Sequence, residues 1–445
     1  KILIANRGEI VQRAIRTIKE MGKKSVAIYS AGDKNASYLK HADEAVCIGG
    51  AKSSESYLNI PAIITAAEMT GCDAIFPGYG FLSENQDFVE ICKLHNIKFI
   101  GPSSDVMEKM ADKSKAKEEM VKAGVPVVPG SKGAVRTLEE GKKIAKEIGY
   151  PIMAKASAGG GGRGMRLIKE EAEFDHMYLA ASSEALAAFG DGTMYLERFI
   201  NNPRHIEVQV LGDSHGNAIH IGERDCSLQR RHQKVIEESP AILLNDETRA
   251  KLHEVAVKAT KYLKYEGAGT FEFLADDKQN IYFMEMNTRL QVEHPVSEMV
   301  SGLDIVEWMI KVAEGEKLPA QDAIKFRGHA IECRITAEDP NTFLPCPGKI
   351  TQWMVPGGRN VRVDSHIYTN YIVPPYYDSM IGKLIVWGRD REKAINIMKR
   401  ALSEFEVEGI KTNIPFHIKM MQNKDFIQNK YDTKYLENYK GLDSI

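Results

Sequence analysis

The strongest constraint on the fold is an alternation of short apolar segments with amphipathic ones over residues 1–110. The apolar segments predict strands at Ile2–Ala5, Ser25–Tyr29, Ala45–Ile48, Asp73–Phe76 and Lys98–Ile100. Strands that alternate with helices form βαβ units, which predicts a parallel sheet. Because 445 residues exceed one simple core, we expect two to four subdomains of mixed α/β and α+β class.

Helix boundaries in this region are predicted from capping residues. Asn6–Glu9 and Ser83–Gln86 each resemble a capping pair. Pro61 favours the first turn of a further helix, which Gly71 would end. The charged run Asp105–Lys122 predicts one continuous helix with a solvated face.

A glycine run follows the apolar strand Ile152–Ala156, which carries a single lysine, Lys155. The run Ser157–Met165 is not a Walker A loop, since no Lys-Ser/Thr follows its last glycine, and no dinucleotide fingerprint follows the first strand. Consecutive glycines leave backbone N–H groups free to wrap a polyanion. A flexible hairpin tip is the alternative; Lys155 and an acidic hairpin further on favour phosphate binding.

That acidic hairpin consists of the strands Thr270–Leu274 and Ile281–Arg289, joined by the polar turn Ala275–Asn280. Pairing about the middle of the turn places Glu272 roughly opposite Glu285. Two carboxylates that face each other across strands repel, so the pair is unfavourable without a cation between them.

The residues after Glu285 support a metal site over two solvated glutamates. Side chains in a strand repeat every second residue, so Glu285, Asn287 and Arg289 would share one face. Hard oxygen ligands favour Mg²⁺, which commonly also holds substrate phosphates, and a guanidinium binds anions.

The segment between these two regions contains further strands. Tyr195–Ile200 and His205–Val210 are strand candidates, and the second alternates so that Glu207 and Gln209 are typical of a solvent-facing side. The run Glu223–Lys234 is too short and too mixed in charge for a nucleic-acid patch, and we interpret it as an anion site.

Composition excludes several classes of protein. A formal net charge of −2 provides no general attraction to nucleic acid or an anionic membrane. The apolar runs are short, so no membrane span is expected, and the segment before Asn6 is too short for a signal peptide. Six scattered cysteines without a CxxC pair indicate reduced thiols in a cytoplasmic protein.

Taken together, the motifs closely resemble biotin carboxylase, a member of the ATP-grasp superfamily. The resemblance rests on Lys113, Lys155, GGGGRGM, RDCSLQRRHQK, GTFEF, EMNTRLQVEHPVSE, Arg334 within ECRITAEDP, and PPYYDSMIGK, and it covers essentially the whole chain. It implies an N-terminal parallel-sheet α/β domain (1–112), a central ATP-grasp domain (113–315) with a glycine-rich lid at roughly 129–203, and a C-terminal mixed α+β domain (328–445).

The resemblance also implies a nucleotide and metal site. Lys113 and Lys155 contact the ATP phosphates, and the loop with Gly161 and Gly162 closes over them. The other nucleotide-binding positions are Met165, Glu197, Arg198, Phe199, Ile200, His205, Gln229, His232 and Leu274. The ligands of Mg²⁺ or Mn²⁺ are Glu272, Glu285 and Asn287. Arg198 stands where a lysine is common, which alters the approach to adenine, and Cys346 replaces a usual serine.

The implied reaction is ATP-dependent carboxylation of biotin with bicarbonate, through carboxyphosphate, which yields ADP and phosphate. Glu293 would be the general base and Arg334 the biotin-binding arginine. The remaining substrate-binding positions are Tyr79, Lys234, Arg289, Gln291 and Val292, of which Lys234 and Arg289 also act in catalysis.

The resemblance further implies partners. No Met-Lys-Met tripeptide is present, and Ile418–Met421 is interpreted as packing at the core edge, so we expect a separate biotin carboxyl carrier protein and separate carboxyltransferase subunits. The family commonly forms homodimers. Acetyl-CoA carboxylase is the favoured system and a pyruvate carboxylase subunit the alternative.

Two other functions remain open at this stage. A related ligase of the carbamoyl phosphate synthetase type would share the glycine loop and metal hairpin but would not need Arg334. A non-catalytic ATP-binding regulator is disfavoured, because it has no use for a complete metal and base set.

Overall fold

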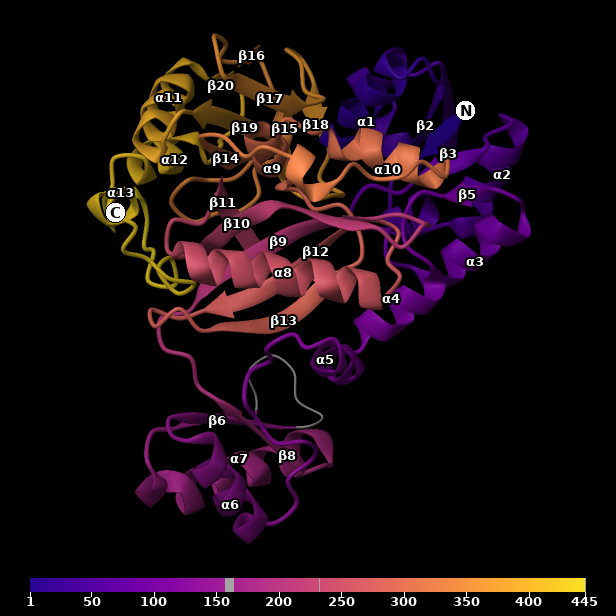
Figure 1. Cartoon of the computed structure of the whole chain (residues 1–445). Coiled ribbons are helices and arrows are strands. Elements are labelled where there is room, and N and C mark those ends of the chain that lie inside the picture. Colours follow the sequence, from indigo (N-terminus) through magenta and orange to yellow (C-terminus); the bar gives the residue numbers. More distant parts are fainter. Residues whose placement is uncertain (157–163, 232, 445) are drawn as a thin grey trace.

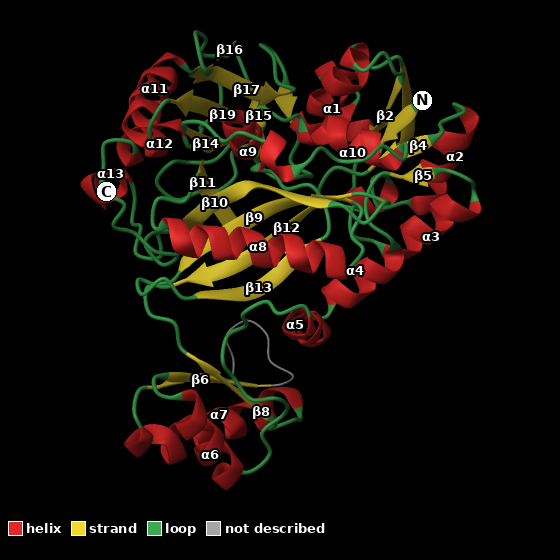
Figure 2. Cartoon of the chain, viewed as in Figure 1, coloured by secondary structure: helices red, strands yellow, loops and turns green. Residues whose placement is uncertain are grey.

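The computed structural model describes residues 1–156, 164–231 and 233–444, apart from the side chains of residues 113, 114 and 189. The N-terminal and C-terminal regions lie side by side on a central body of strands, and a small α/β unit stands apart at the other end (Figure 1). Helices flank the central strands on both sides (Figure 2). The chain is therefore a mixed α/β and α+β structure.

The N-terminal region contains the predicted parallel sheet, in the order β3-β2-β1-β4-β5. The strands are β1 (Ile2–Ile4), β2 (Ser25–Ser30), β3 (Glu44–Gly49), β4 (Ala74–Phe76) and β5 (Lys98–Phe99). The helices between them are α1 (Glu9–Glu20), α2 (Ile60–Met69) and α3 (Gln86–Leu94). Alternate residues of β1 enter two different apolar clusters, so both faces of the sheet are buried, as in other parallel sheets.

The predicted cap of α1 is wrong. The residue before the helix is Gly8, at a φ of 81°, and no side chain caps the first turn. Asn6 instead donates from Nδ2 to the carbonyls of Pro77 (2.8 Å) and Tyr79 (2.7 Å), in the loop after β4. A tertiary hydrogen bond between two loops at the strand ends has replaced a local one.

Two other helix predictions differ from the structure for local reasons. Asn85, not Ser83, caps α3 by accepting a hydrogen bond from the Phe88 amide (2.8 Å). The charged run was predicted to form one helix but forms two. Asp112 between them has an extended backbone, and its side chain caps the second helix by accepting a hydrogen bond from the Lys115 amide (2.9 Å). The two helices are α4 (Ser104–Ala111) and α5 (Lys113–Lys122).

The central body is an eight-stranded sheet in the order β13-β12-β9-β10-β11-β14-β19-β17. Its strands are β9 (Arg204–Gly212), β10 (Ala218–Arg230), β11 (Gln233–Ser239), β12 (Gly267–Ala275), β13 (Ile281–Asn287), β14 (His329–Thr336), β17 (Val361–Ser365) and β19 (Met380–Gly388). Helix α8 (Asp246–Tyr262) packs on β9 and β10, where Figure 1 shows it crossing the sheet. The other helices of this body are α9 (His294–Ser301), which packs on β10, β11, β14 and β19, and α10 (Ile305–Ala313).

Strand β9 has an apolar face and a polar face, and both are buried. Its alternate apolar residues join the core beneath α8. Glu207 and Gln209 occupy the other face, and both are fully buried, so the prediction that they face solvent is wrong. The reason is Arg224 on β10, which is also fully buried. Its guanidinium donates to the Glu207 carboxylate (2.9 Å) and to the side-chain amide oxygen of Gln209 (2.7 Å). Alternation alone cannot distinguish solvent from a buried polar layer.

The small unit has its own sheet and core. Strands β6 (Ile152–Ala156), β7 (Met165–Ile168) and β8 (Met194–Arg198) pair antiparallel in the order β7-β6-β8. Helices α6 (Leu138–Ile148) and α7 (Phe174–Phe189) complete an apolar cluster that is separate from those of the main body.

The C-terminal region continues the central sheet through β14, β19 and β17, and its core takes in Leu228, Val235 and Ile236 from β10 and β11. Two small ribbons pair β15 (Gly348–Lys349) with β18 (Ile372–Val373) and β16 (Gln352–Met354) with β20 (Glu406–Glu408). The helices are α11 (Arg391–Glu404), α12 (Ile414–Met420) and α13 (Lys424–Ile427). Of the segment predicted to pack at the core edge, Ile418 is partly buried against this core as expected, whereas Met420 and Met421 are fully buried within it.

Short 3₁₀ helices connect several of these elements, at Ala31–Asp33, Ser37–Lys40, Ser53–Glu55, Glu171–Glu173, Gln321–Ala323 and Leu442–Ser444. Across the described ranges, we find no helix whose length and apolar character would let it span a bilayer.

Two buried histidines predict a loss of stability in mild acid. Burial lowers the pKa of His366 to about 3 and that of His417 to about 4. The unfolded chain therefore takes up these protons first, as the pH falls below about 6.5, and stability is lost from there down to the folded pKa values. We expect unfolding free energy to drop by about 2 kcal/mol per histidine between pH 7.5 and 5. Urea unfolding at the two pH values measures it.

The matched variants are His366→Phe and His176→Gln. His366→Phe removes one buried titrating ring and keeps an aromatic group against Tyr371, so the pH-dependent loss should shrink by about 2 kcal/mol. His176 is exposed, and its replacement controls for the loss of a histidine as such. An unchanged pH dependence in His366→Phe would contradict the assignment.

Candidate active site

The centre of the candidate site is Lys234 on β11, whose ammonium lies among three carboxylates. Its Nζ lies 2.9 Å from Glu272 Oε1 and 2.8 Å from Glu293 Oε1, and it also contacts Glu207. Its side chain is only 13% exposed. Burial alone would lower the pKa of Lys234, but the three carboxylates outweigh it and raise that pKa well above its ordinary value. Lys234 is therefore a fixed positive charge at the middle of an acidic layer.

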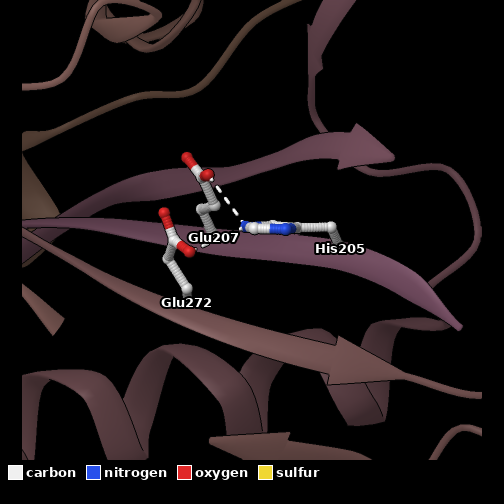
Figure 3. Close-up of side chains that lie close together, drawn as sticks. All are labelled: His205, Glu207 and Glu272. Carbon is white, nitrogen blue, oxygen red and sulfur yellow. Dashed lines mark ion pairs between the residues drawn. The ribbon is translucent and has the colours of Figure 1, made fainter. Parts of the chain in front are cut away.

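Glu207 and Glu272 also share a histidine. His205 Nε2 lies 3.1 Å from Glu207 and 3.2 Å from Glu272, and Figure 3 shows both carboxylates pointing toward the imidazole. Burial lowers the pKa of His205, yet hydrogen bonding to the two carboxylates outweighs it and raises the value to about 9. On its other side, His205 Nδ1 lies 2.9 Å from Gln229 Nε2. The structure thus brings two predicted nucleotide-binding residues, His205 and Gln229, next to the metal-type carboxylate Glu272.

Glu293, directly before α9, lies between two cations. Its Oε1 accepts from Lys234, and its Oε2 accepts from Arg334 Nη2 at 2.9 Å. Glu293 is fully buried; burial raises its pKa, but Lys234 and Arg334 bring the net shift below the ordinary value. Arg334 is held from behind by Glu237, whose carboxylate accepts from Nε at 2.6 Å and whose pKa burial raises to about 7. The site therefore presents an ionised carboxylate with a cation on each oxygen.

The predicted acidic hairpin is present in the predicted register. Strands β12 and β13 are antiparallel, and Glu272 pairs directly with Glu285. Asn287 Nδ2 donates to Glu272 at 2.8 Å, and Gln291 Nε2 does so at 3.2 Å. Two carboxylates and an amide on paired strands are residue types that Mg²⁺ or Mn²⁺ prefers. In this structure Glu272 Oε1 accepts from Lys234 as well as from Asn287, so a bound ion would have to displace these contacts.

A second grouping of ligand types is less suitable for a metal. His205, Glu207 and Glu272 have ligand atoms within 4.8 Å of one another, as do those of Glu207, Cys226 and Glu293. Lys234 already contacts both Glu207 and Glu272, and Arg224 bonds Glu207. In either group, a metal ion would lie next to cations that already neutralise its carboxylate ligands. We therefore assign no metal ion to these two groups.

Arg289 extends the site toward the N-terminal region. Its Nε donates to Glu84 at 2.9 Å, and its Nη2 donates to Asn287 Oδ1 at 3.2 Å. Glu84 also accepts from the Thr288 amide at 3.0 Å. The predicted anion-binding guanidinium is thus held by a residue about two hundred positions earlier in the chain.

On the small unit, Lys155 and Glu197 form an ion pair. Lys155 Nζ lies 2.6 Å from Glu197, and Lys117 lies 3.3 Å from the other carboxylate oxygen. Burial raises the pKa of Glu197, but the two lysines produce a net lowering. Arg198, next along β8, donates from Nη2 to the carbonyl of Ile148 at the end of α6 (2.5 Å). Its charge therefore stabilises a helix terminus of the small unit in this structure.

Of the remaining predicted nucleotide residues, Leu274 pairs with His205 across β12 and β9, and the others that the structure describes lie on the small unit or just after it. Phe199 follows β8 beneath Lys434, whose Nζ is 5.3 Å from the ring centre, and Ile200 beside it is buried. Met165 begins β7 and Leu274 lies in β12. Gly161, Gly162 and His232 lie outside the described residues, as does the side chain of Lys113.

A cavity of about 800 Å³ opens next to this network, between the N-terminal and C-terminal regions. Its lining includes Tyr79, Lys234, Val292 and Arg334, all predicted substrate-binding residues. It is therefore the space in the described structure where a substrate can reach both Arg334 and Lys234.

Sequence reasoning missed several residues of the network. Glu207 is in phase with His205 on one strand, the same signal that connected Glu285 with Asn287, but it was assigned to solvent. Arg224 lies inside the run interpreted as an anion site and instead neutralises Glu207. Glu84 has no acidic neighbour and Glu237 is followed by Glu238, and no local pattern could have connected them with Arg289 and Arg334.

Comparison with known proteins covers the whole chain. The family model of the biotin carboxylase N-terminal domain matches residues 1–107, that of the carbamoyl-phosphate synthase L chain ATP-binding domain matches 112–321, and that of the biotin carboxylase C-terminal domain matches 332–438. A biotin carboxylase of Nostoc sp. is 56% identical over 439 residues, which cover 98% of each chain.

Two solved structures are also similar. A biotin carboxylase of Campylobacter jejuni, solved as a β-γ-ATP complex, is 68% identical with a TM-score of 0.89, and the match covers 98% of each chain. The biotin carboxylase domain dimer of the Hydrogenobacter thermophilus 2-oxoglutarate carboxylase is 52% identical with a TM-score of 0.86, covering 98% of this chain and 96% of that one. That structure holds MgADP, ADP and bicarbonate.

An N-terminal parallel sheet, a central antiparallel sheet with an acidic hairpin, and a small α/β unit define an ATP-dependent ligase with an ATP-grasp domain. Matching family models over all three regions and full-length relatives above 50% identity then fix the family. The chain belongs to the biotin carboxylase family.

Proposed function

We propose that this chain carboxylates biotin carried on a separate protein, using bicarbonate and ATP through carboxyphosphate, with release of ADP and phosphate. The observation that carries the proposal is Glu293, an ionised carboxylate fixed between Lys234 and Arg334, both of which line the cavity. Bicarbonate is a weak nucleophile with a weakly electrophilic carbon, so it needs both deprotonation and phosphorylation.

Each predicted catalytic or substrate-binding residue has a role in that chemistry. Glu293 accepts the bicarbonate proton, and the same proton later helps carboxyphosphate to release CO₂. Lys234 and the planar fork of Arg289 hold the bicarbonate oxygens, with Gln291 and Val292 as the pocket wall. Arg334 stabilises the enolate-like oxygen of the biotin ureido group when N1′ attacks CO₂, and the phosphate released from carboxyphosphate takes up the N1′ proton. Tyr79 lines the same cavity.

ATP binds on the side of Lys155 and the acidic hairpin. Lys113 and Lys155 bind the phosphates, with the glycine loop at Gly161 and Gly162 over them. The proposed nucleotide contacts are otherwise Met165, Glu197, Arg198, Phe199, Ile200, His205, Gln229, His232 and Leu274. Glu272, Glu285 and Asn287 hold Mg²⁺ or Mn²⁺, which neutralises phosphoryl charge when bound. Lys155 must exchange Glu197 for phosphate, so nucleotide binding breaks an existing ion pair.

We propose the division 1–112, 113–315 and 328–445, with the lid at about 129–203, supported by the separate core of the small unit. The partners proposed are a biotin carboxyl carrier protein, carboxyltransferase subunits and a second copy of this chain. A cytoplasmic location is supported by six free cysteines. Acetyl-CoA carboxylase is the favoured system. The alternative is a 2-oxo acid system such as pyruvate carboxylase. The similarity to a 2-oxoglutarate carboxylase domain is the observation in support of this alternative.

The test is ATP hydrolysis by the purified chain with Mg²⁺ and bicarbonate, with and without free biotin. We expect ADP release that requires bicarbonate and rises with biotin. Hydrolysis that ignores biotin but responds to ammonia would instead support a ligase of the carbamoyl phosphate synthetase type. ATP binding without hydrolysis would support a regulator.

A further inference from the structure

A second buried lysine lies behind the candidate site and has no role in the function proposed above. Lys383 on β19 is fully buried, and its ammonium donates to the backbone carbonyl of Val292 at 2.8 Å. Val292 precedes Glu293, so this bond holds the backbone of the segment that carries the proposed base. A lysine without exposed surface is rare unless it is paired.

The sheet register explains how this lysine reaches the site. Lys383 pairs with Arg334 across β14 and β19, so the two side chains lie next to each other on one face. That face packs against α9 and the segment before it. Arg334 holds the side chain of Glu293, while Lys383 holds the carbonyl one residue earlier.

Lys383 is also connected to cavity-lining residues of the N-terminal region. Its Nζ lies 3.0 Å from Glu9 Oε1, at the start of α1, and that oxygen accepts a hydrogen bond from the Tyr79 hydroxyl. Asp364 on β17 is a more distant neighbour at 4.0 Å. Burial lowers the pKa of Lys383, but Glu9 and the neighbouring acids outweigh it and raise the value.

We propose that Lys383 is a positioning residue: its ammonium fixes the Val292 carbonyl and, through Glu9, the Tyr79 hydroxyl, so that these two lining residues of the substrate cavity keep a constant separation. The inference rests on the proposed function of that cavity. Lys383 joins three regions, since Val292 follows the central hairpin, Glu9 and Tyr79 belong to the N-terminal region, and β19 to the C-terminal one. It does not touch the reacting atoms.

The rival explanation is that Lys383 only balances the buried charge of Glu9. Three variants separate the two: Lys383→Met, Glu9→Gln, and the double variant. The double variant removes one charge of each sign and so limits the cost of an unpaired buried carboxylate, but it still leaves Val292 without the ammonium. Glu9→Gln keeps Lys383 and retains an acceptor for Tyr79.

The kinetic readout is KM for bicarbonate, kcat, and KM for ATP, together with Tm. We expect Lys383→Met and the double variant to raise KM for bicarbonate or lower kcat, for a combined loss of about tenfold or more in kcat/KM, because a buried carbonyl loses its donor. KM for ATP should stay within about twofold, and the double variant should recover Tm relative to Lys383→Met. Glu9→Gln weakens the link to Tyr79 but leaves the ammonium–carbonyl bond in place, so its loss in kcat/KM for bicarbonate should be smaller than that of the double variant.

Two results would overturn the proposal. One is a double variant with normal bicarbonate kinetics, which would leave charge balance as the only role of Lys383. The other is a Glu9→Gln variant that is as defective as the double variant. Glu9→Gln retains the bond from Lys383 to the Val292 carbonyl, so an equal defect would show that this bond does not matter. Amide hydrogen exchange across residues 290–294 gives a readout that needs no activity: faster exchange in the double variant supports the proposal and unchanged exchange opposes it. If the wild-type chain shows no biotin-stimulated turnover, the proposed function fails, and the exchange experiment still decides on Lys383.

Discussion

Replacing Lys234 with methionine is expected to reduce bicarbonate-dependent turnover by about a thousandfold, since a fixed charge on the reacting oxygens is removed. The same change leaves Glu207, Glu272 and Glu293 without their shared cation. Breaking a buried ion pair from one side costs about 3 to 5 kcal/mol, so the unfolding free energy should fall by that amount. Steady-state ATP hydrolysis and urea unfolding at pH 7.5 measure the two effects.

The matched control is Lys109→Met. Lys109 pairs with Asp105 at 2.8 Å on an exposed helix surface, where such a pair contributes less than about 1 kcal/mol. Turnover should be unchanged in this control. If the Lys234→Met chain is as stable as the control, the three carboxylates can be protonated or hydrated without a loss of unfolding free energy. That result would contradict the role of Lys234 as the cation that stabilises them.

Replacing Glu293 with glutamine is expected to lower biotin-stimulated turnover by about a hundredfold to ten-thousandfold, because an amide cannot accept the bicarbonate proton. The amide oxygen still accepts one hydrogen bond from Lys234 or Arg334, so the local structure should be kept. Because Glu293 is not among the proposed ATP contacts, ATP affinity should stay within about twofold. The measurements are kcat with saturating bicarbonate and KM for ATP. Full carboxylation by this variant would exclude Glu293 as the base.

Glu298→Gln is the control for the loss of a buried carboxylate as such. Glu298 lies on α9, one turn and more beyond Glu293, and pairs with Arg13 and Arg362 at 2.7 Å each, away from Lys234. This variant should lose stability and keep its kcat. If it loses activity as strongly as Glu293→Gln, the effect reflects the disruption of α9 and not the missing base.

Much of the candidate site could be predicted from the sequence because its signals are local. The opposition of Glu272 and Glu285 follows from one short turn, and the parallel N-terminal sheet follows from the alternation of strands with helices. Chain proximity limits the pairings in both cases. The chemistry of bicarbonate activation came from motif resemblance, which carries information from many residues at once.

Only the tertiary structure decided which polar residues are buried and which partner each one takes. Glu207 and Gln209 have the alternation of a solvent face, yet Arg224 covers them and is itself bonded to Ser297 on α9. Asn6 has the sequence of a helix cap but bonds the loop after β4. In a buried site, a polar group can take its partner from a distant part of the chain instead of from a neighbouring residue. Leaving the group unpaired costs more free energy than the net contribution of a typical hydrogen bond, so the tertiary contact that pairs it prevails.

Lys383 illustrates the same limit most clearly. By itself it is one lysine in an apolar strand, and only the pairing of β19 with β14 places it beside Arg334 and under Val292. The sequence by itself determined the parallel N-terminal sheet, the acidic hairpin and the resemblance to the family. The separation of the cavity walls and the cations that flank Glu293 were decided by contacts among three regions, which no local pattern records.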